Sequence, residues 1–491
     1  MNISLPSINY LALAPVLTMV GGALILLFAT ALSAGRLGRR LTTSAALLTG
    51  VAALVETFFQ WSYVVHHGAT TTAAYAIAFD GFSVVATAAI AIGFILTTLV
   101  AHDWSAREGF VGAEFHILAL AATSGAMVMA QANDLIVIFL GLEILSIGLY
   151  VLVAFDRHRA SSAEASLKYF LLGGFASAIF IYGAALTYGA TGSTTLSVIA
   201  TFLTGTFLIK NGVLVAGAGL LLVGFAFKVA AVPFHLWAPD VYEGAPSPVT
   251  GLMAAIVKVG AFTAVLRVLA SALGTSAYAW RPIVWVLVVL TTFAGAGLAL
   301  VQQNIKRLLA YSSITNAGFI LLGLWSTSPR GAAATLYYVL TYAPLIISTF
   351  AVVTLVGGPG DTRHGLENYR GLARRQPWLG GCLTVLLLAQ SGAPFTTGFF
   401  AKYSVVAAAI GAGGAILAAL VMLAAAIAAY VYLRLVLALY AEDTDDTAVL
   451  VPVPTGTGLV ITLGAASSIL FGVWVGPLVN LAHHATLLFL P

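Results

Sequence analysis

Four ionisable residues lie inside strongly apolar segments. Glu143 occupies the middle of "IVIFLGLEILSIGLYVL" and Lys258 the middle of "LMAAIVKVGAFTAVL", while Lys228 and Lys402 lie near prolines in two further segments. A charge near the centre of a bilayer costs about 2.5–3.5 kcal/mol on insertion scales, so it usually faces a partner or a hydrated cavity. Burial and a nearby carboxylate act in opposite directions on the proton affinity of a lysine. The four residues therefore favour a chain of titratable groups over a buried ion pair that only fixes helix packing.

Two of these lysines accompany prolines that interrupt helices. Pro233 follows Lys228 in "FKVAAVPFHLWAPDVYEGAPSPV", and Pro394 precedes Lys402 in "AQSGAPFTTGFFAKYSVV". Proline lacks a backbone N–H and clashes with the carbonyl group four residues earlier, so the helix kinks or parts. In a membrane the freed backbone groups need partners from protein or water. Two interrupted spans, each with a lysine, are the pattern expected at the transport site of an inverted-repeat transporter.

Uncharged polar residues gather in the same segments, where a chain of water molecules would need them. For any one of them, ordinary interhelical hydrogen bonding is the favoured interpretation. His235 is expected to anchor the freed backbone rather than bind a metal, because no second ligand lies at a useful spacing. The other residues are Tyr311, Ser312, Ser313, Thr315 and Asn316, and then Gln390, Ser391, Thr396 and Thr397.

The remaining charges in apolar segments have simpler interpretations. Lys168 lies four residues after Glu164, which suits a helical surface pair, and a role in proton uptake stays equally open. Arg267 and Arg434 lie near helix ends, so snorkelling of their side chains to the interface is favoured. Glu56 is interpreted as a packing contact or a lateral feature.

The elements that must hold these residues are membrane-spanning helices. Hydrophobic residues make up 60% of the 491 residues and charged residues 8%, against roughly 25% charged in a soluble domain. The composition indicates an all-α polytopic membrane protein with one integral membrane domain over 1–491, and no strand pattern is evident. Runs of about 20 apolar residues mark spans. Fourteen are expected, at about 10–33, 42–64, 81–101, 113–131, 134–154, 165–190, 212–237, 248–271, 282–302, 308–325, 331–356, 378–410, 414–440 and 457–482.

Composition also disfavours two kinds of chemistry. The single cysteine, Cys382, cannot supply the several thiolates that an iron–sulfur cluster needs, so no redox centre, cofactor or metal is expected in this chain. The net charge of +4 is small and the basic residues are scattered, which argues against binding of nucleic acid.

The basic residues of the loops predict the orientation of the chain. Twelve lie in odd-numbered loops and three in even-numbered loops. The positive-inside rule then places the odd loops in the cytoplasm and both termini on the outer side. The odd loops hold Arg36, Arg39, Arg40, Arg107, Arg157, Arg159, Lys306, Arg307, Arg363, Arg370, Arg374 and Arg375, and the even loops hold Lys210, Arg281 and Arg330.

The interrupted spans are the seventh and twelfth, five helices apart, so they cross the membrane in opposite directions. Spans 4–8 (113–271) and 9–13 (282–440) would then form two inverted five-helix repeats. The match is imperfect, because Lys228 precedes its proline whereas Lys402 follows its own. Proline spacing aligns Lys228 with Ala389.

The stretch from Pro239 to Pro248 is predicted to be the cytoplasmic turn between the seventh and eighth spans. Ser247 can cap the eighth helix while Pro248 occupies its first turn. Asp240 and Glu243 are then loop residues, and a structural or interfacial role is favoured for them over membership of the buried path.

Taken together, five stretches resemble the antiporter-like membrane subunits of respiratory complex I, the proton-pumping NADH:quinone oxidoreductase. The resemblance extends over almost the whole chain. Within the family, the "APDVYEGAPSPV" form, Lys402 and an end soon after the last span look most like the subunit N branch. The stretches are "FLGLEILSIGLYVLVAF", "FKVAAVPFHLWAPDVYEGAPSPVT", "IVKVGAF", "NIKRLLAYSSITNAGF" and "GAPFTTGFFAKYSV".

This resemblance implies a proton channel in which Glu143 modulates Lys228, Lys258 lies near the centre of a polar axis and Lys402 passes the proton outward. Lys168 and His235 are further candidates for the path. The resemblance also implies that NADH, FMN, iron–sulfur clusters and quinone bind to other subunits, which drive this chain through electrostatic and conformational coupling. Its partners would be other membrane-arm subunits, including antiporter-like neighbours, in a bacterial inner membrane.

Two alternatives stay open at this point. The chain could serve a related cation/proton antiporter complex or membrane-bound hydrogenase, since these use the same superfamily. A different class of function is a membrane scaffold that transports nothing, in which the buried charges only specify packing.

Overall fold

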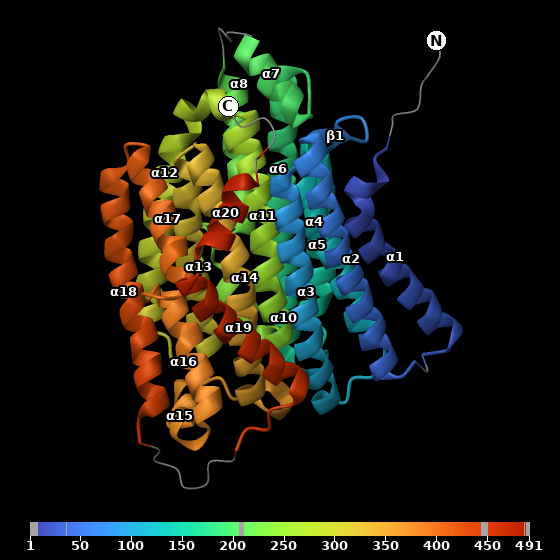
Figure 1. Cartoon of the computed structure of the whole chain (residues 1–491), viewed down its shortest axis with the longest axis vertical. Coiled ribbons are helices and arrows are strands. Elements are labelled where there is room, and N and C mark those ends of the chain that lie inside the picture. The colour runs from blue at the N-terminus through green and yellow to red at the C-terminus, as the bar shows by residue number, and fades with distance from the viewer. Residues whose placement is uncertain (1–7, 36, 206–210, 443–449, 486, 488–491) are drawn as a thin grey trace.

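The computed structural model describes residues 8–35, 37–205, 211–442, 450–485 and 487, so the loop residues Arg36 and Lys210 lie outside the described residues. Most helices stand side by side in one upright bundle (Figure 1). Within the described ranges, eleven helical segments are long and apolar enough to cross a membrane. They are α1 (Tyr10–Leu32), α2 (Arg39–His67), α3 (Gly81–Glu108), α5 (Leu135–Val153), α6 (Ala160–Thr191), the helix Ser247–Ala272, the segment Gly274–Leu300 with η3 (Gly274–Ser276) and α12 (Ala277–Leu300), α13 (Ile305–Trp325), α14 (Pro329–Gly357), α18 (Ala415–Tyr440) and α19 (Thr455–Val473).

Three of the fourteen expected spans are not among these eleven. The helix α4 (Glu114–Gln131) has only 18 residues and contains several polar side chains. The other two are interrupted, as α8 (Gly212–Lys228) followed by α9 (Trp237–Gly244), and as α16 (Pro377–Ser391) followed by α17 (Thr397–Gly411). Fourteen crossings therefore stay a prediction. The remaining short elements are α7 (Leu196–Gly205), η4 (Pro359–Asp361), η5 (Leu366–Tyr369), α15 (Leu372–Arg375) and α20 (Gly476–His484).

The expectation that the chain has no strands is wrong in one place. The strands β1 (Thr70–Thr72) and β2 (Ile77–Phe79) pair antiparallel, with Thr71 opposite Ala78. Three consecutive residues between them, 73–75, have positive φ angles. This small hairpin escaped notice because each strand has three residues, which is too short to show an alternating pattern.

The segment Ser247–Ala272 is a continuous helix that contains two π-helical segments. It begins as α10 (Ser247–Leu252), passes through the π-helical η1 (Met253–Val257) into α11 (Lys258–Val265), and ends in the π-helical η2 (Leu266–Ala272). Its whole apolar window is buried inside the bundle. Lys258 lies directly after the first π segment, and such bulges occur frequently at functional sites.

Small residues bring α6 and α8 close together. A side-chain carbon at Gly183 of α6 would lie 2.7 Å from the Leu221 nitrogen of α8, and one at Gly217 would lie 2.9 Å from the Thr187 nitrogen. Such small-residue contacts let helix backbones approach in membrane bundles. Because α8 ends at Lys228, this contact fixes that lysine relative to the side chains of α6.

Arg267 does not snorkel to the interface as expected. The residue is 2% exposed, and its Nη1 and Nη2 donate to the two carboxylate oxygens of Asp80 at 2.9 and 2.7 Å. Nε donates to the Ala130 carbonyl at 2.9 Å. Asp80 also caps α3, accepting a hydrogen bond from the Ser83 N–H at 2.8 Å. This bidentate pair joins the start of α3 to the start of η2, so its role is structural.

Replacing Asp80 with alanine is expected to destabilise the chain by about 3–5 kcal/mol, because Arg267 is left buried without its carboxylate. The double variant Asp80→Ala/Arg267→Met should recover most of that loss. Thermal unfolding of the purified protein in detergent measures both, with Glu114→Gln, an exposed residue, as the control. If Asp80→Ala unfolds at the same temperature as the control, the pair is not a major structural contact.

Candidate proton path

Lys228 is the last residue of α8 and is buried. Its Nζ donates to Ser146 Oγ of α5 at 2.7 Å and to Tyr169 Oη of α6 at 3.3 Å, and it lies 5.4 Å from the centre of the Tyr169 ring. The negative end of the helix dipole favours a cation at this position. Within the described part of the chain, Lys228 forms no ion pair; neutral groups hold its ammonium.

The interruption between α8 and α9 contains Pro233, and side chains from elsewhere bind its freed backbone groups. The Val232 N–H donates to Thr291 Oγ1 at 3.0 Å, and Trp237 Nε1 donates to the Phe227 carbonyl at 2.9 Å. These contacts meet the requirement that non-helical backbone inside a membrane be satisfied by protein or water. The break is thus a stable part of the fold.

His235 lies buried in the same interruption. Its ring hydrogen-bonds the backbone of Pro233, while Nδ1 has no hydrogen-bond partner among the described residues. The first contact agrees with the anchoring role expected for His235, and the second leaves one ring nitrogen available for water.

Glu143 lies in the middle of α5 and is partly exposed. The Ser177 hydroxyl of α6 donates to its carboxylate. Ser146, which binds Lys228, follows three residues later on the same face of α5. The charge of Glu143 lies within electrostatic reach of Lys228 without a direct ion pair between them. Glu143 and the hydroxyl group that binds Lys228 thus lie one helical turn apart on α5.

Lys258 is buried and donates to the Ser313 carbonyl of α13. Its Nζ lies 4.8 Å from the centre of the Tyr342 ring, and Ser313 Oγ lies 3.1 Å from Tyr242 Oη of α9. In the ranges that the structure describes, no carboxylate pairs with Lys258, so the alternative of a buried structural ion pair has no partner there. The ammonium depends on a carbonyl group and an aromatic face.

Lys402 lies in α17 but reaches back across the break that contains Pro394. Its Nζ donates to the carbonyl groups of Gln390 and Ser391, the last residues of α16, at 3.0 and 2.7 Å. The C-cap of α16 is Gly392, with φ +88°, and a side-chain carbon there would lie 2.9 Å from Lys402 Cδ. The ammonium of Lys402 thus lies at the carboxyl end of the first half of a broken helix, which is also where Lys228 lies. This placement explains why the two lysines do not align by proline spacing.

The helix α13 connects Lys258 with Lys402. Ser313 provides the carbonyl group for Lys258, and the ring of Phe319 lies 5.0 Å from Lys402 Nζ. Between them, Ser312 Oγ contacts Tyr432 Oη, and Asn316 Oδ1 accepts a hydrogen bond from Tyr338 at 2.7 Å. Of the polar residues expected to serve a water chain, these on α13 are the ones that lie between two lysines.

Charged side chains line a cavity of ≈ 460 Å³ at the start of α6. Lys168 pairs with Glu164 at 2.8 Å and with Asp240 at 2.7 Å, and Arg307 joins Asp240 to Glu243, both at 2.8 Å. Burial alone would raise the pKa of Asp240, but the hydrogen bonds from Lys168 and Arg307 lower it. The predicted Glu164–Lys168 pair is therefore present, and Lys168 also lies beside Tyr169, a ligand of Lys228.

Asp240 and Glu243 are not loop residues as predicted. They belong to the helix α9, which fills much of the expected turn between Pro239 and Pro248. The prolines in this segment masked the helix, because Pro239 lies in its first turn, where proline is tolerated. The preference for a structural role agrees with their ion pairs to Lys168 and Arg307.

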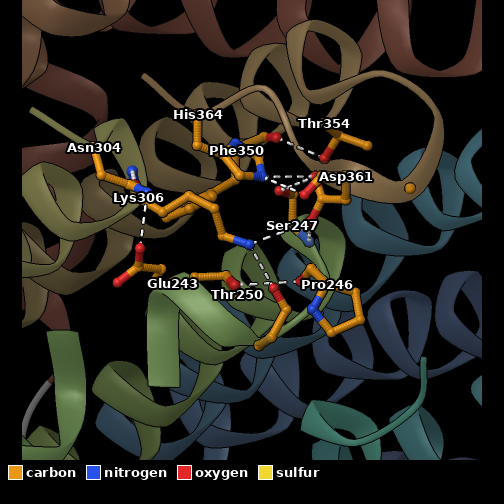
Figure 2. A network of polar contacts seen from close by, with 12 residues as sticks. Glu243, Pro246, Ser247, Thr250, Asn304, Lys306, Phe350, Thr354, Asp361 and His364 are labelled. Atoms are coloured by element: carbon orange, nitrogen blue, oxygen red, sulfur yellow. Dashed lines mark hydrogen bonds and ion pairs between the residues drawn. The ribbon is translucent and has the colours of Figure 1, made fainter. Parts of the chain in front are cut away.

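Asp361, in the loop after α14, joins the starts of three helices, and Figure 2 shows Ser247 and Lys306 gathered around it. Its carboxylate lies 3.2 Å from Lys306 Nζ and 3.4 Å from Arg159 Nη1. It accepts hydrogen bonds from the Ser247 N–H at 3.0 Å and the Ser247 hydroxyl at 2.7 Å. Burial alone would raise the pKa of this carboxyl, but Lys306, His364 and Ser247 hold it well below its usual range.

This network corrects two predictions. Lys306, counted as a loop residue, is fully buried in the first turn of α13. Ser247 does not cap the eighth helix with its own side chain, since α10 has no side-chain cap of its own and Ser247 donates to Asp361 instead. The loop "GGPGDTRHGLENYRGLARRQ" looks solvated because it is polar, and nothing local reveals that one of its acids is buried.

Two further charges can be placed. Glu56 accepts a hydrogen bond from the Thr18 hydroxyl of α1 at 2.7 Å, so it contacts a neighbouring helix. Arg434 is half-buried, and its guanidinium donates to the carbonyl groups of Leu300 and Gln302 at the end of α12, at 2.6 and 3.0 Å. It therefore binds a helix end rather than only the interface.

Among the described residues, no group of three or more His, Cys, Asp or Glu side chains could hold a metal ion. The groups that can do chemistry are the buried lysines, Glu143 and the hydroxyl groups between them. Their arrangement suits the binding and release of protons in a low-dielectric interior.

Comparison with known proteins agrees with this arrangement. Residues 132–428 match the family model described as NADH:quinone oxidoreductase/Mrp antiporter, TM. NADH-quinone oxidoreductase subunit N of Trichlorobacter lovleyi is 40% identical over 79% of this chain and 80% of that protein. The subunit N of Salinispora arenicola is 38% identical over 99% of both chains.

A solved structure extends the comparison to the fold. A chain of respiratory complex I from Thermus thermophilus with bound aureothin is 34% identical and superposes with a TM-score of 0.81, over 96% of this chain and 99% of that chain. The family match covers more than half of the sequence, and the relatives named subunit N align over most or all of it. The chain therefore belongs to the antiporter-like family of NADH:quinone oxidoreductase membrane subunits, and within it to the subunit N branch.

Proposed function

We propose that this chain is a proton-translocating membrane-arm subunit of an NADH:quinone oxidoreductase, in which Glu143, Lys228, Lys258 and Lys402 carry the proton path. The observation that best supports this is the nature of the lysines' partners, which are hydroxyl groups, carbonyl groups and aromatic faces. An ammonium held by a carboxylate resists loss of its proton, because the partner charge would then be left buried alone. An ammonium held by neutral groups can lose its proton without that penalty.

The proposed route begins at the charged cavity beside Lys168. Tyr169 follows Lys168 in α6 and binds Lys228, so it links the cavity to the first buried lysine. From there the route passes Tyr242 of α9 to Lys258. The polar face of α13 then leads to Lys402 at the second break. Water molecules would complete the gaps between these side chains, with Nδ1 of His235 as a further contact point.

Glu143 is proposed to set the proton affinity of Lys228. It is partly exposed at the side of the bundle, and its charge reaches Lys228 without contact. A change of charge in a neighbouring subunit can therefore alter Glu143 and, through it, Lys228. The energy for this change would come from redox chemistry in other subunits, which bind NADH, FMN, iron–sulfur clusters and quinone.

The proposal includes the arrangement in the membrane. Spans 4–8 (113–271) and 9–13 (282–440) are proposed as inverted antiporter-like repeats within one integral membrane domain of fourteen crossings, with both termini on the outer side of the bacterial inner membrane. The interruptions near Pro233 and Pro394, each with a lysine ammonium at a helix end, support this pairing. The partners are other membrane-arm subunits, including antiporter-like neighbours.

A scaffold that transports nothing fits these observations less well. Its buried charges should be satisfied permanently, as in the Asp80–Arg267 pair. The path lysines lack such carboxylate partners within the described residues. Burying them therefore costs desolvation free energy that no ion pair offsets.

Lys228→Ala and Lys402→Ala are each expected to lower proton translocation per assembled complex by on the order of tenfold or more, because a positioned proton-transfer group contributes about 10²–10⁴-fold. Pumping is measured in membrane vesicles during NADH oxidation and normalised to assembled complex, with Arg330→Gln, an exposed residue, as the control. Normal proton stoichiometry in both lysine variants would overturn the proposed path, whereas impaired assembly with normal pumping per complex would favour the scaffold.

Gly392→Ala is expected to impair pumping through its contact with Lys402. An added Cβ lies 2.9 Å from Lys402 Cδ and must displace the lysine from the end of α16. Gly413→Ala is the matched control, because Gly413 also has a positive φ angle, +82°, but nothing lies within 4 Å of an added Cβ. Both variants carry the same backbone strain of about 1–3 kcal/mol. Equal pumping in the two would show that the position of Lys402 does not matter.

A further inference from the structure

Asp361 lies at the point where several elements of the path begin. Its buried carboxylate contacts Ser247, the first residue of α10, and Lys306, in the first turn of α13. It also lies near Arg159, the N-cap residue of α6. These three helices provide Lys258, Ser313 and Tyr169 respectively. One side chain from a distant loop therefore touches the starts of three of the helices that line the path.

The contact with α10 is a helix cap supplied from outside the helix. The N-cap position of α10 is Pro246, which offers no side-chain acceptor. Asp361 takes that role by accepting both the N–H and the hydroxyl of Ser247, at 3.0 and 2.7 Å. A carboxylate at this end also interacts favourably with the helix dipole. The start of α10 is thus held by Asp361 rather than by its own sequence.

The contact of Asp361 with α13 holds the start of that helix next to the start of α10. Lys306 Nζ lies 3.2 Å from the Asp361 carboxylate and donates to the Ala245 carbonyl, two residues before α10, at 2.5 Å. The first turns of the helices Ser247–Ala272 and α13 therefore contact the same carboxylate, that of Asp361. Any sliding of one along the other would break these contacts.

The distances along the two helices show how their common starting point affects the contact between Lys258 and Ser313. At about 1.5 Å per residue, Lys258 lies roughly 16 Å along its helix from Ser247, and Ser313 lies roughly 10 Å along α13 from Lys306. A helical side chain points back toward the N-terminus of its own helix, so the Lys258 side chain leans toward the level of Ser313. Its ammonium then meets the Ser313 carbonyl, as observed. The contact at Lys258 depends on where both helices begin.

The loop that carries Asp361 is itself held firmly. The Ile305 N–H donates to the His364 carbonyl at 2.7 Å and the Leu366 N–H to the Gln303 carbonyl at 2.9 Å, which join the loop to the start of α13. The Gly360 N–H donates to Glu108 at 2.8 Å, at the end of α3. Asp361 has a positive φ angle of 50°, a conformation that surrounding contacts must maintain.

We propose that Asp361 is a positioning residue for the Lys258 site, which sets the alignment of the helix Ser247–Ala272 against α13 and so holds the Lys258 ammonium on the Ser313 carbonyl. This inference rests on the proposed function, because it assigns Asp361 to a step of the same proton path. Asp361 lies outside the chain of buried lysines and is not proposed to bind a proton on the route.

The lowered pKa of Asp361 is consistent with a permanent contact. A carboxyl group whose pKa is lower in the folded than in the unfolded state adds stability above its unfolded pKa, roughly 3.9, and loses it as the pH falls toward the folded value. Asp361 therefore stays ionised from about pH 5 to 8 and does not switch in the working range. The Asp361 carboxylate is thus available to Lys306 and Ser247 throughout this range.

The test replaces Asp361 with asparagine in the assembled complex. Asp361→Asn keeps the shape but removes the charge that binds Lys306. Proton translocation per NADH is expected to fall on the order of tenfold, since misplacing a reacting group by about 1 Å can cost up to about 100-fold. A cryo-EM map of the assembled variant should show that the Lys258 ammonium no longer reaches the Ser313 carbonyl. Normal pumping in Asp361→Asn would overturn the proposal.

Asp103→Asn is the matched control. Asp103 caps α19 in the same way, accepting the N–H and hydroxyl of Thr457 at 2.8 and 2.7 Å, but α19 carries none of the path lysines. Pumping in Asp103→Asn should stay within about twofold of the parent protein, because removal of a cap costs about 0.5–2 kcal/mol of stability only. An equal decrease in both variants would mean that removing any cap is harmful and would overturn the specific role of Asp361.

The double variant Asp361→Asn/Lys306→Met separates positioning from charge balance. The double variant leaves no unpaired lysine, so assembly should recover if Asp361→Asn alone assembles poorly. The alignment of the helix Ser247–Ala272 against α13 is still not held, so pumping should stay low. Recovery of full pumping would overturn the proposal, as would failure of both variants to assemble, which would indicate a role in folding alone. Lys258→Ala distinguishes the two proposals: if it pumps normally, the proposed path is wrong, and if it is impaired while Asp361→Asn is normal, only the positioning role is wrong.

Discussion

The structure depends on one constraint, the cost of holding an ammonium group inside an apolar bundle. Each path lysine meets it at a place where regular helical hydrogen bonding ends or changes. Lys228 ends α8, Lys402 reaches the end of α16, and Lys258 follows a π-helical segment. These irregular sites offer free carbonyl groups, helix dipoles and close hydroxyl groups. The bundle therefore stabilises these charges with neutral partners, as the proposed exchange of protons requires.

Two other buried cations, in contrast, have carboxylate partners. Arg267 has a bidentate carboxylate partner in Asp80, and Lys306 has a carboxylate partner in Asp361. Both pairs lie at helix ends and join elements that are distant in the sequence. The contrast separates two classes of buried cation in one molecule. Paired cations hold the frame, and cations with neutral partners line the proposed path.

The residues of the proposed path could be singled out from the sequence, because their signals are local. A lysine in an apolar run, a proline after it and the apolar stretch around Glu143 can each be recognised within about 20 residues. The pairs Arg267–Asp80 and Lys306–Asp361 could not be predicted, since their members are 187 and 55 residues apart. The position of the Lys402 ammonium also escaped prediction, because it depends on a side chain reaching back across a break. Sequence spacing gives the position of a backbone and not the direction of a long side chain.

The most direct test of the path concerns the link between Lys258 and Lys402 rather than the lysines themselves. Asn316→Leu removes the polar group in the middle of α13, which binds Tyr338 and the Ser312 carbonyl, and leaves every lysine in place. Proton translocation per NADH is measured in vesicles with assembled complex, with Thr123→Val, a buried hydroxyl on α4 bonded within its own helix, as the control. We expect pumping to fall on the order of tenfold in Asn316→Leu and to stay unchanged in the control. Unchanged pumping in Asn316→Leu would contradict a proton route along α13.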